Sequence, residues 1–444
     1  MRAPPRRSRL PAVRRRRSLC TMQDVNDHPL AHVQGAAMAA SVDLSVRSDL
    51  QAAAPDPVEV FLGQPVTITR LTEHKVPKSE EGLRMLAADG SWRAVAALAE
   101  HLLGESHPID ELLRIRWYRI VALLKARDVQ QAEREFALLG DLYGPSWTYE
   151  RYPGMFPMRK GSMVPFAMLL LQALLPSYGG DNNTSLTRLY ELLSRTETQL
   201  RETSDPKSVR LLNIERQKTI LALINIFGAV GDLPVAIAHL EKLLNEVDEL
   251  CPPLGEESVK KDPPALVATI SSAGPTIIAR GRPAAKSELL SLLGRIHIQV
   301  GDVKSAEATF QQMEALIPAD TPDLAQQVMV HLNRGLLQVA HGDYESALHE
   351  FTCVRRLDGA NVAAANNCAV CHLFCERLSD AVATLEDFVR ANPGAHLQQA
   401  VAANMAALYQ MVEGGAEMMQ TLEKLVFAVA SDDFDTSVLQ LRPS

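Results

Sequence analysis

Apolar side chains recur along this chain with the spacing of an amphipathic helix. In residues 287–300 they fall at i, i+3 and i+7, on one helical face: Leu293, Ile296 and Val300. Gly301 and Asp302 then interrupt the pattern, because glycine accepts the left-handed backbone that ends a helix and aspartate can cap the next one. The apolar face that follows consists of Ala306, Phe310 and Met313. We therefore predict two antiparallel helices joined by a tight turn.

The same hairpin returns twice toward the C-terminus. Small residues stand where two helices would cross, and a large apolar residue follows: Gly294, Ala306 and Phe310, then Gly335, Ala347 and Phe351, then Ala369, Ala381 and Leu385. The distance from Gly335 to Ala369 is 34 residues, which is the tetratricopeptide period. One hairpin cannot bury its own apolar faces, so neighbouring repeats must stack. The pattern predicts an all-α fold, a right-handed α-solenoid of tetratricopeptide-type helical hairpins.

The remaining segments follow from changes in composition. We expect a disordered N-terminal extension at 1–57, an extended lead-in at 58–78, an N-terminal helical-repeat half at 79–250, a proline-rich insertion at 251–286 and a C-terminal tetratricopeptide-repeat half at 287–444. The lead-in contains short β-like runs at 60–62 and 66–69. Prolines such as Pro263, Pro264 and Pro283 prevent the insertion from forming one helix.

Residues 1–20 are basic, with eight arginines and no acid. They fit a mitochondrial transit peptide, a basic tail that contacts acidic lipid or nucleic acid, a disordered extension, or a gene-model artefact. Removing these eight charges from the net charge of −8 leaves −16 for residues 21–444. A body this acidic is a poor nucleic-acid binder, so no nucleic-acid partner is expected.

The cysteines and the apolar runs indicate a cytoplasmic protein. Six cysteines in 444 residues make no disulfide framework, and residues 1–20 lack the apolar run of a secretory signal. The longest apolar stretch, residues 163–175, is far shorter than the roughly 20 residues of a transmembrane helix. We expect no integral membrane segment.

Catalytic motifs are largely missing from the sequence. It has no phosphate-binding loop of the P-loop type and no serine elbow, and the His349-Glu350 pair has Cys353 where a zinc protease needs its second histidine. Cys368, Cys371 and Cys375 share one face of a predicted helix, which favours core thiols over a metal site. We therefore expect no enzyme, no cofactor and no metal.

Two features are candidates for partner binding. Four asparagines recur on the first helices of successive repeats, where their amides can bind a peptide backbone or else bond neighbouring groups between repeats: Asn333, Asn366, Asn367 and Asn404. Residues 143–165 are rich in proline and aromatic residues and long for a connection between stacked helices. They fit a partner-binding loop or a loop packed on the solenoid edge.

Several runs outside the generic repeat pattern resemble the trafficking protein particle complex subunit 12 family. They are LLGRIHIQVGDVKSAEATFQQME (292–314), NNCAVCHLFCERLSDAVATLEDFVRANP (366–393), GSMVPF (161–166) and DDFDTSVLQL (432–441). The resemblance covers residues 79–441. The N-terminal region here is shorter than the long one of animal members.

The resemblance implies a non-catalytic scaffold subunit of a vesicle-tethering complex that activates a Rab GTPase. It would act in endoplasmic-reticulum-to-Golgi transport and autophagy, and associate peripherally with intermediate-compartment and Golgi membranes. Its partners would be the other subunits and, indirectly, the Rab protein, while exchange chemistry would belong to the small core subunits. The alternative from the residues alone is a tetratricopeptide adaptor or co-chaperone that binds peptide segments in its concave groove.

Overall fold

The computed structural model describes residues 56–63, 70–250, 282–318 and 320–440. Within these ranges the ordered elements are helices, and the β-structure consists of one isolated antiparallel bridge between Thr148 and Ser162. None of the described helices combines the length and the apolar composition needed to cross a membrane. The chain therefore has the all-α fold that the sequence predicted.

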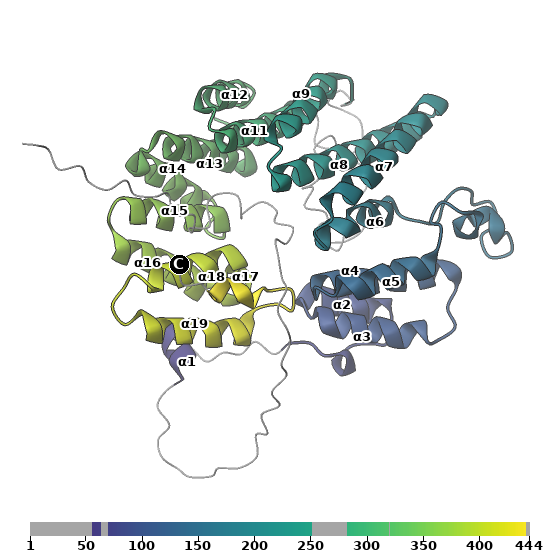
Figure 1. The fold of residues 1–444 in the computed structure, drawn as a ribbon, viewed down its shortest axis with the longest axis horizontal. Coiled ribbons are helices and arrows are strands. Elements are labelled where there is room, and N and C mark those ends of the chain that lie inside the picture. The colour runs from purple at the N-terminus through teal and green to yellow at the C-terminus, as the bar shows by residue number, and fades with distance from the viewer. Residues whose placement is uncertain (1–55, 64–69, 251–281, 319, 441–444) are drawn as a thin grey trace, which may run out of the picture.

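The long helices follow one another in antiparallel pairs (Figure 1). Those before the proline-rich region are α2 (Glu80–Asp89), α3 (Trp92–Leu103), α4 (Ile109–Lys125), α5 (Val129–Leu139), α6 (Phe166–Tyr178), α7 (Asn182–Glu202), α8 (Pro206–Val230) and α9 (Leu233–Leu250). Those after it are α11 (Arg282–Val300), α12 (Val303–Ala315), α13 (Leu324–His341), α14 (Tyr344–Leu357), α15 (Val362–Phe374), α16 (Leu378–Ala391), α18 (Gln399–Tyr409) and α19 (Gly415–Val429). Shorter pieces are α1 (Pro57–Leu62), α17 (Pro393–His396), η1 (Glu73–Lys75), η2 (Pro145–Trp147), η3 (Tyr149–Arg151) and η5 (Thr436–Leu439).

The turns within the hairpins have the chemistry that the sequence predicted. Between α13 and α14, Gly342 adopts φ 80°, and its N–H bonds back to the last turn of α13. Asp343 then accepts a hydrogen bond from the backbone N–H of Ser346 at 3.1 Å and so caps α14. Asp128, Asp181 and Asp302 cap α5, α7 and α12 in the same way. These short turns hold each pair antiparallel.

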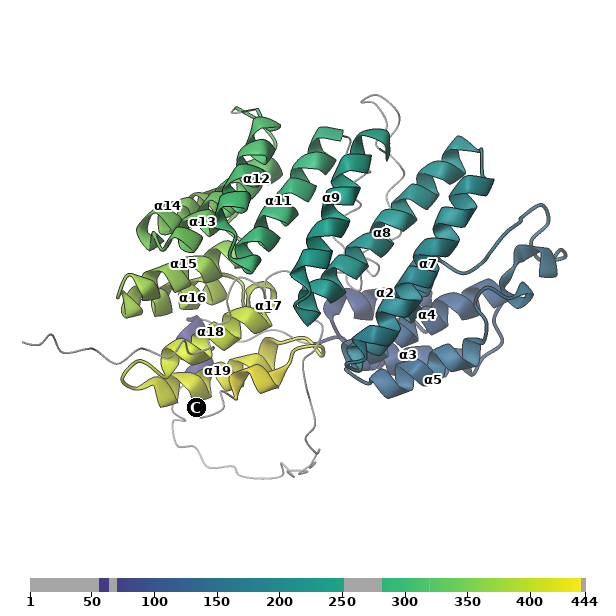
Figure 2. The same cartoon turned by 45° about the horizontal axis from the view of Figure 1, so that its top comes forward.

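Stacking of the pairs produces one continuous series of helix contacts. Adjacent helices pack from α2 onward, and α9 packs directly against α11 across the proline-rich region. The buried apolar residues lie between the layers in successive clusters, beginning around α3 and α4 and ending around α16, α18 and α19. The result is a curved α-solenoid (Figures 1 and 2). The division of this solenoid into two halves around the proline-rich insertion stays a prediction.

Two boundaries differ from the sequence prediction. Residues 57–62 form helix α1 rather than a β-like run, because Asp56 caps the N-terminus and Pro57 occupies a first-turn position where it is tolerated. For the same reason α11 begins at Arg282, before the predicted residue 287: Pro283 lies in the first turn and does not interrupt the helix. The predictions for residues 1–55, 66–69 and 251–281 lie outside the described residues.

Candidate protein-interaction site

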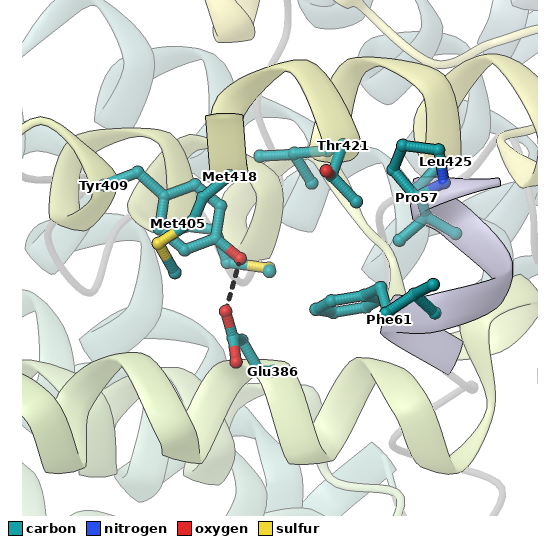
Figure 3. A pocket seen from close by; sticks show the side chains of 10 residues that line it. Pro57, Phe61, Glu386, Met405, Tyr409, Met418, Thr421 and Leu425 are labelled. Carbon is teal, nitrogen blue, oxygen red and sulfur yellow. Dashed lines mark hydrogen bonds between the residues drawn. The ribbon is translucent and has the colours of Figure 1, made fainter. Parts of the chain in front are cut away.

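An apolar groove at the C-terminal end of the solenoid is the strongest candidate site. It is a cavity of about 480 Å³ between α1, α16, α18 and α19. Its walls are mostly aliphatic, aromatic and methionine side chains: Pro57, Val60, Phe61, Glu386, Met405, Tyr409, Met418, Thr421, Leu422 and Leu425. Figure 3 shows Phe61 and Tyr409 facing the open space from opposite sides. Such a groove suits an apolar side chain of a partner.

Tyr409 and Glu386 form a hydrogen-bonded pair with a structural role in the groove. The Tyr409 hydroxyl donates a hydrogen bond to the Glu386 carboxylate at 2.9 Å (Figure 3). Burial, together with the neighbouring carboxylate, raises the pKa of Tyr409 above its ordinary value, so the phenol stays protonated and donates. The pair fixes the Tyr409 ring as a wall of the groove.

Helix α1 closes one side of this groove although it lies far away in the sequence. The Arg390 guanidinium donates to the Phe61 carbonyl oxygen at 2.9 Å and lies 4.6 Å from the centre of the Phe61 ring. Val58 is buried against the same cluster, whereas Val60 stays exposed at the rim. The chain thus shows that this end of the solenoid accepts a short apolar helix.

All four asparagines are buried, and three of them make hydrogen bonds between repeats. Asn333 is fully buried, where its Nδ2 donates to Ser291 Oγ at 2.8 Å and its Oδ1 accepts from Arg295 Nε at 2.9 Å. In the same way Asn404 Nδ2 donates to Asn366 Oδ1 at 2.8 Å, and both residues are buried. Asn367 is buried as well. Because a buried amide cannot reach a bound peptide, the concave-surface interpretation is corrected in favour of inter-repeat hydrogen bonds.

The repeat-packing residues meet at the crossings of the hairpins. An added Cβ on Gly294 would lie 2.3 Å from the Phe310 ring, and one on Gly335 would lie 2.5 Å from the Phe351 ring. The other predicted positions are buried around these crossings: Ala306, Ala347, Ala369, Ala381 and Leu385. In each glycine-containing repeat, therefore, the aromatic ring lies directly on the glycine backbone.

The cysteines of α15 lie partly in the core. Cys368 and Cys371 are buried, and Cys375 is half-buried. Burial raises the pKa of Cys371 to about 12, so its thiol is protonated at neutral pH. Across the described part of the chain, no three histidine, cysteine or acidic side chains converge as a metal site requires.

A contact that the sequence did not predict joins the two ends of the solenoid. Residues 431–440, which follow the last long helix, pack against the first hairpins (Figure 2). Lys125 pairs with Asp433 at 3.1 Å, and Arg127 pairs with Asp435 at 2.6 Å. Asp432 accepts from the backbone N–H of Arg93 at 3.0 Å. The acidic run in this segment was visible in the sequence, but nothing there identified its basic partners about 300 residues away.

We expect this end contact to depend on charge and salt. The double variant Asp433→Asn/Asp435→Asn should lower the free energy of unfolding by about 0.5–2 kcal/mol at low ionic strength, since both ion pairs are only partly exposed. The loss should shrink in 0.5–1 M NaCl, where screening already weakens the native pairs. Chemical denaturation at both salt concentrations measures it.

The matched control is Glu413→Gln/Glu423→Gln, which removes the same charge from exposed positions near the same end. Equal losses in the two double variants would show that net charge, and not the end contact, is responsible.

Comparison with known proteins finds two curated relatives that share most of this chain. No family model matches it. It is 30% identical over 406 residues to trafficking protein particle complex subunit 12 of Mus musculus and 31% identical over 406 residues to that of Homo sapiens. Each alignment includes 86% of this chain but 47% and 51% of the relatives, so the chain spans about half their length.

Three solved structures superpose only in part. BtubC from P. vanneervenii has a TM-score of 0.34 and 15% identity, over 60% of this chain and 94% of that one. The P58(IPK) TPR domain has a TM-score of 0.24 and 14% identity, over 77% and 86%. Yeast Tom70 has a TM-score of 0.25 and 12% identity, over 81% and 87%.

The two sequence alignments confirm the resemblance that the motifs indicated. They include most of the chain and therefore more than one of its repeat regions. Over 86% of its length, this α-solenoid is a relative of trafficking protein particle complex subunit 12.

Proposed function

We propose that this protein is a non-catalytic scaffold subunit of a multisubunit vesicle-tethering complex of the trafficking protein particle type. The observation that carries the proposal is the alignment with subunit 12 over 86% of the chain. The structure is compatible with it, because stacked hairpins offer long surfaces for other proteins. The proposal extends to Rab activation by the whole complex, endoplasmic-reticulum-to-Golgi transport and autophagy, at cytoplasmic faces of intermediate-compartment and Golgi membranes.

The apolar groove is the proposed contact with another subunit. Its lining is mostly apolar and includes Met405 and Met418, whose flexible side chains adapt to a partner's shape. Catalysis of nucleotide exchange is assigned in this proposal to other subunits.

The groove also favours one alternative function. Because the helices around it already pack against the chain's own α1, the groove is suited to a short apolar helix from a transient partner. In that case the protein would be a tetratricopeptide adaptor or co-chaperone that recognises peptide segments. The two functions differ in the size of the binding partner and in its stoichiometry.

Affinity purification of the tagged full chain from cells tests both functions. A scaffold subunit should recover large tethering subunits in stoichiometric amounts and migrate well above 48.6 kDa on size exclusion. An adaptor should recover chaperones or assorted proteins in substoichiometric amounts. Migration as a free monomer, with no stoichiometric partner, would contradict the scaffold proposal.

A groove variant makes the test specific to the site. Thr421→Arg places a long charged side chain in the groove, at a position that is only half-buried. We expect it to reduce recovery of the partner subunits at least several-fold, while Glu423→Arg, exposed on the same helix, leaves recovery unchanged. Circular dichroism shows whether both variants fold.

A further inference from the structure

The connection between α5 and α6 projects from the solenoid as a separate feature. It leaves the helical stack at Leu139 and returns at Phe166, and both views show it extending away from the neighbouring helices (Figures 1 and 2). We call its residues 153–161 the tip. The apolar groove is lined by α1, α16, α18 and α19, so the tip shares no residue with that site.

The base of this connection is well ordered by its own contacts. Trp147 is buried, and its Nε1–H donates to the Leu139 carbonyl oxygen at 3.0 Å. Backbone hydrogen bonds run from Met163 N–H to Trp147 and from Tyr149 N–H to Gly161, at 2.8 and 3.0 Å. These hydrogen bonds at the base hold the tip in a defined position, as in compact functional surface loops.

The contacts within the connection also fix how the tip is presented. The Tyr149 and Phe156 rings meet edge to face, with centroids 5.2 Å apart. The Arg159 guanidinium lies over the Tyr149 ring at 5.5 Å. Two methionines close to Phe156 in the sequence are left to solvent: Met155 is 51% exposed and Met158 is 98% exposed.

The charge of the connection is opposite to that of the protein. Arg151, Arg159 and Lys160 are all exposed, whereas the whole chain carries −8. The connection also contains two acidic residues, Asp141 at its base and Glu150, and Glu150 accepts a hydrogen bond from the Gly161 backbone N–H at 2.8 Å. The tip itself, residues 153–161, contains Arg159 and Lys160 and no acidic residue, so the surface that it exposes is cationic and apolar.

We propose that the tip docks directly on anionic lipid headgroups, with Met155 and Met158 entering the interfacial layer. A projecting cationic surface complements a flat anionic membrane, to which arginine and lysine are attracted, while exposed apolar side chains gain from leaving water. The proposal goes beyond association through a complex, because it gives this chain a lipid contact of its own.

Cosedimentation of the purified full chain with vesicles tests the proposal. With phosphatidylcholine vesicles that contain about 30% phosphatidylserine, we expect at least about fivefold more binding than with phosphatidylcholine alone, and a decline in 0.5 M NaCl. Arg159→Glu/Lys160→Glu should reduce binding to the anionic vesicles about tenfold or more. Met155→Ser/Met158→Ser should reduce vesicle binding both at low salt and in 0.5 M NaCl.

Matched controls carry the same chemical changes elsewhere. Lys207→Glu/Lys424→Glu changes the net charge equally at exposed positions, and Phe427→Ser removes a 93% exposed apolar side chain from α19. Both controls should bind vesicles like the unsubstituted protein. Thermal unfolding of every variant shows that loss of binding does not come from unfolding.

Equal binding to the two kinds of vesicle, or equal losses in tip and control variants, overturns the proposal. A second outcome also overturns it: the protein fails to bind vesicles, and the tip variants lose partner subunits in the affinity purification. The tip would then be a protein interface. The subunit composition of the purified complex tests the scaffold function separately, so each proposal can fail alone.

Discussion

Replacement of Glu135 by alanine is expected to lower the free energy of unfolding by about 3–5 kcal/mol. The Glu135 carboxylate pairs with Arg116 and with Arg119, both at 2.8 Å. The Arg119 and Glu135 side chains are only 9% and 6% exposed. Alanine would leave the Arg119 guanidinium buried without its main counter-charge, which costs much more than loss of a surface pair. Chemical denaturation monitored by circular dichroism measures the change.

Glu133 provides the control, because it lies on the same helix and is exposed. Glu133→Ala should change the free energy of unfolding by no more than about 0.5 kcal/mol. In the double variant Arg119→Met/Glu135→Leu, both charges of the more buried pair become apolar, and most of the lost stability should return. A loss in Glu135→Ala no larger than that in Glu133→Ala would show that the pair is not buried in solution.

Substitution of Gly335 by alanine is expected to destabilise the protein by about 1–3 kcal/mol. In an ordinary helix this change is stabilising by about 0.5–1 kcal/mol, because alanine loses less backbone entropy on folding. Here the new Cβ would lie 2.5 Å from the Phe351 ring, which is fully buried and has no free space to move into. Thermal and chemical denaturation give the sign and the size of the effect.

A second glycine and a smaller partner separate crowding from helix propensity. Gly228 lies within α8 and has nothing within 4 Å of an added Cβ, so Gly228→Ala should be neutral or slightly stabilising. Gly335→Ala should cost less stability when it is added to Phe351→Leu than when it is added to the unsubstituted protein, because leucine leaves room for the methyl group. Destabilisation of the same size at both glycines would exclude the close approach as its cause.

These two expected losses locate the stability of the fold in different kinds of contact. The Arg119–Glu135 pair holds α4 against α5 within the first hairpins, whereas the Gly335–Phe351 approach holds α13 against α14 in a later repeat. Because hairpins of a solenoid contact mainly their neighbours, the two losses should add in a combined variant.

Local sequence was enough for most of the helical architecture. The spacing of apolar residues and the Gly-Asp turns at 301–302 and 342–343 predicted the hairpins, because helix period and capping depend on neighbours a few residues apart. The motifs at 292–314 and 366–393 likewise indicated the family resemblance that the alignments confirm. The helical start at Pro57 was missed, since its β-prone residues suggested a strand while Asp56 and Pro57 set the N-terminus of a helix.

Tertiary structure alone decided what the surfaces present. The asparagine row has the period of a binding surface, but only the packing of repeats shows that Asn333 and Asn404 are buried and bonded to neighbouring layers. The apolar groove requires α1, α16, α18 and α19 together, and the end contact joins Asp433 to Lys125. Periodicity fixes which side chains share a helix face, whereas the curvature accumulated over the whole stack determines which distant faces meet.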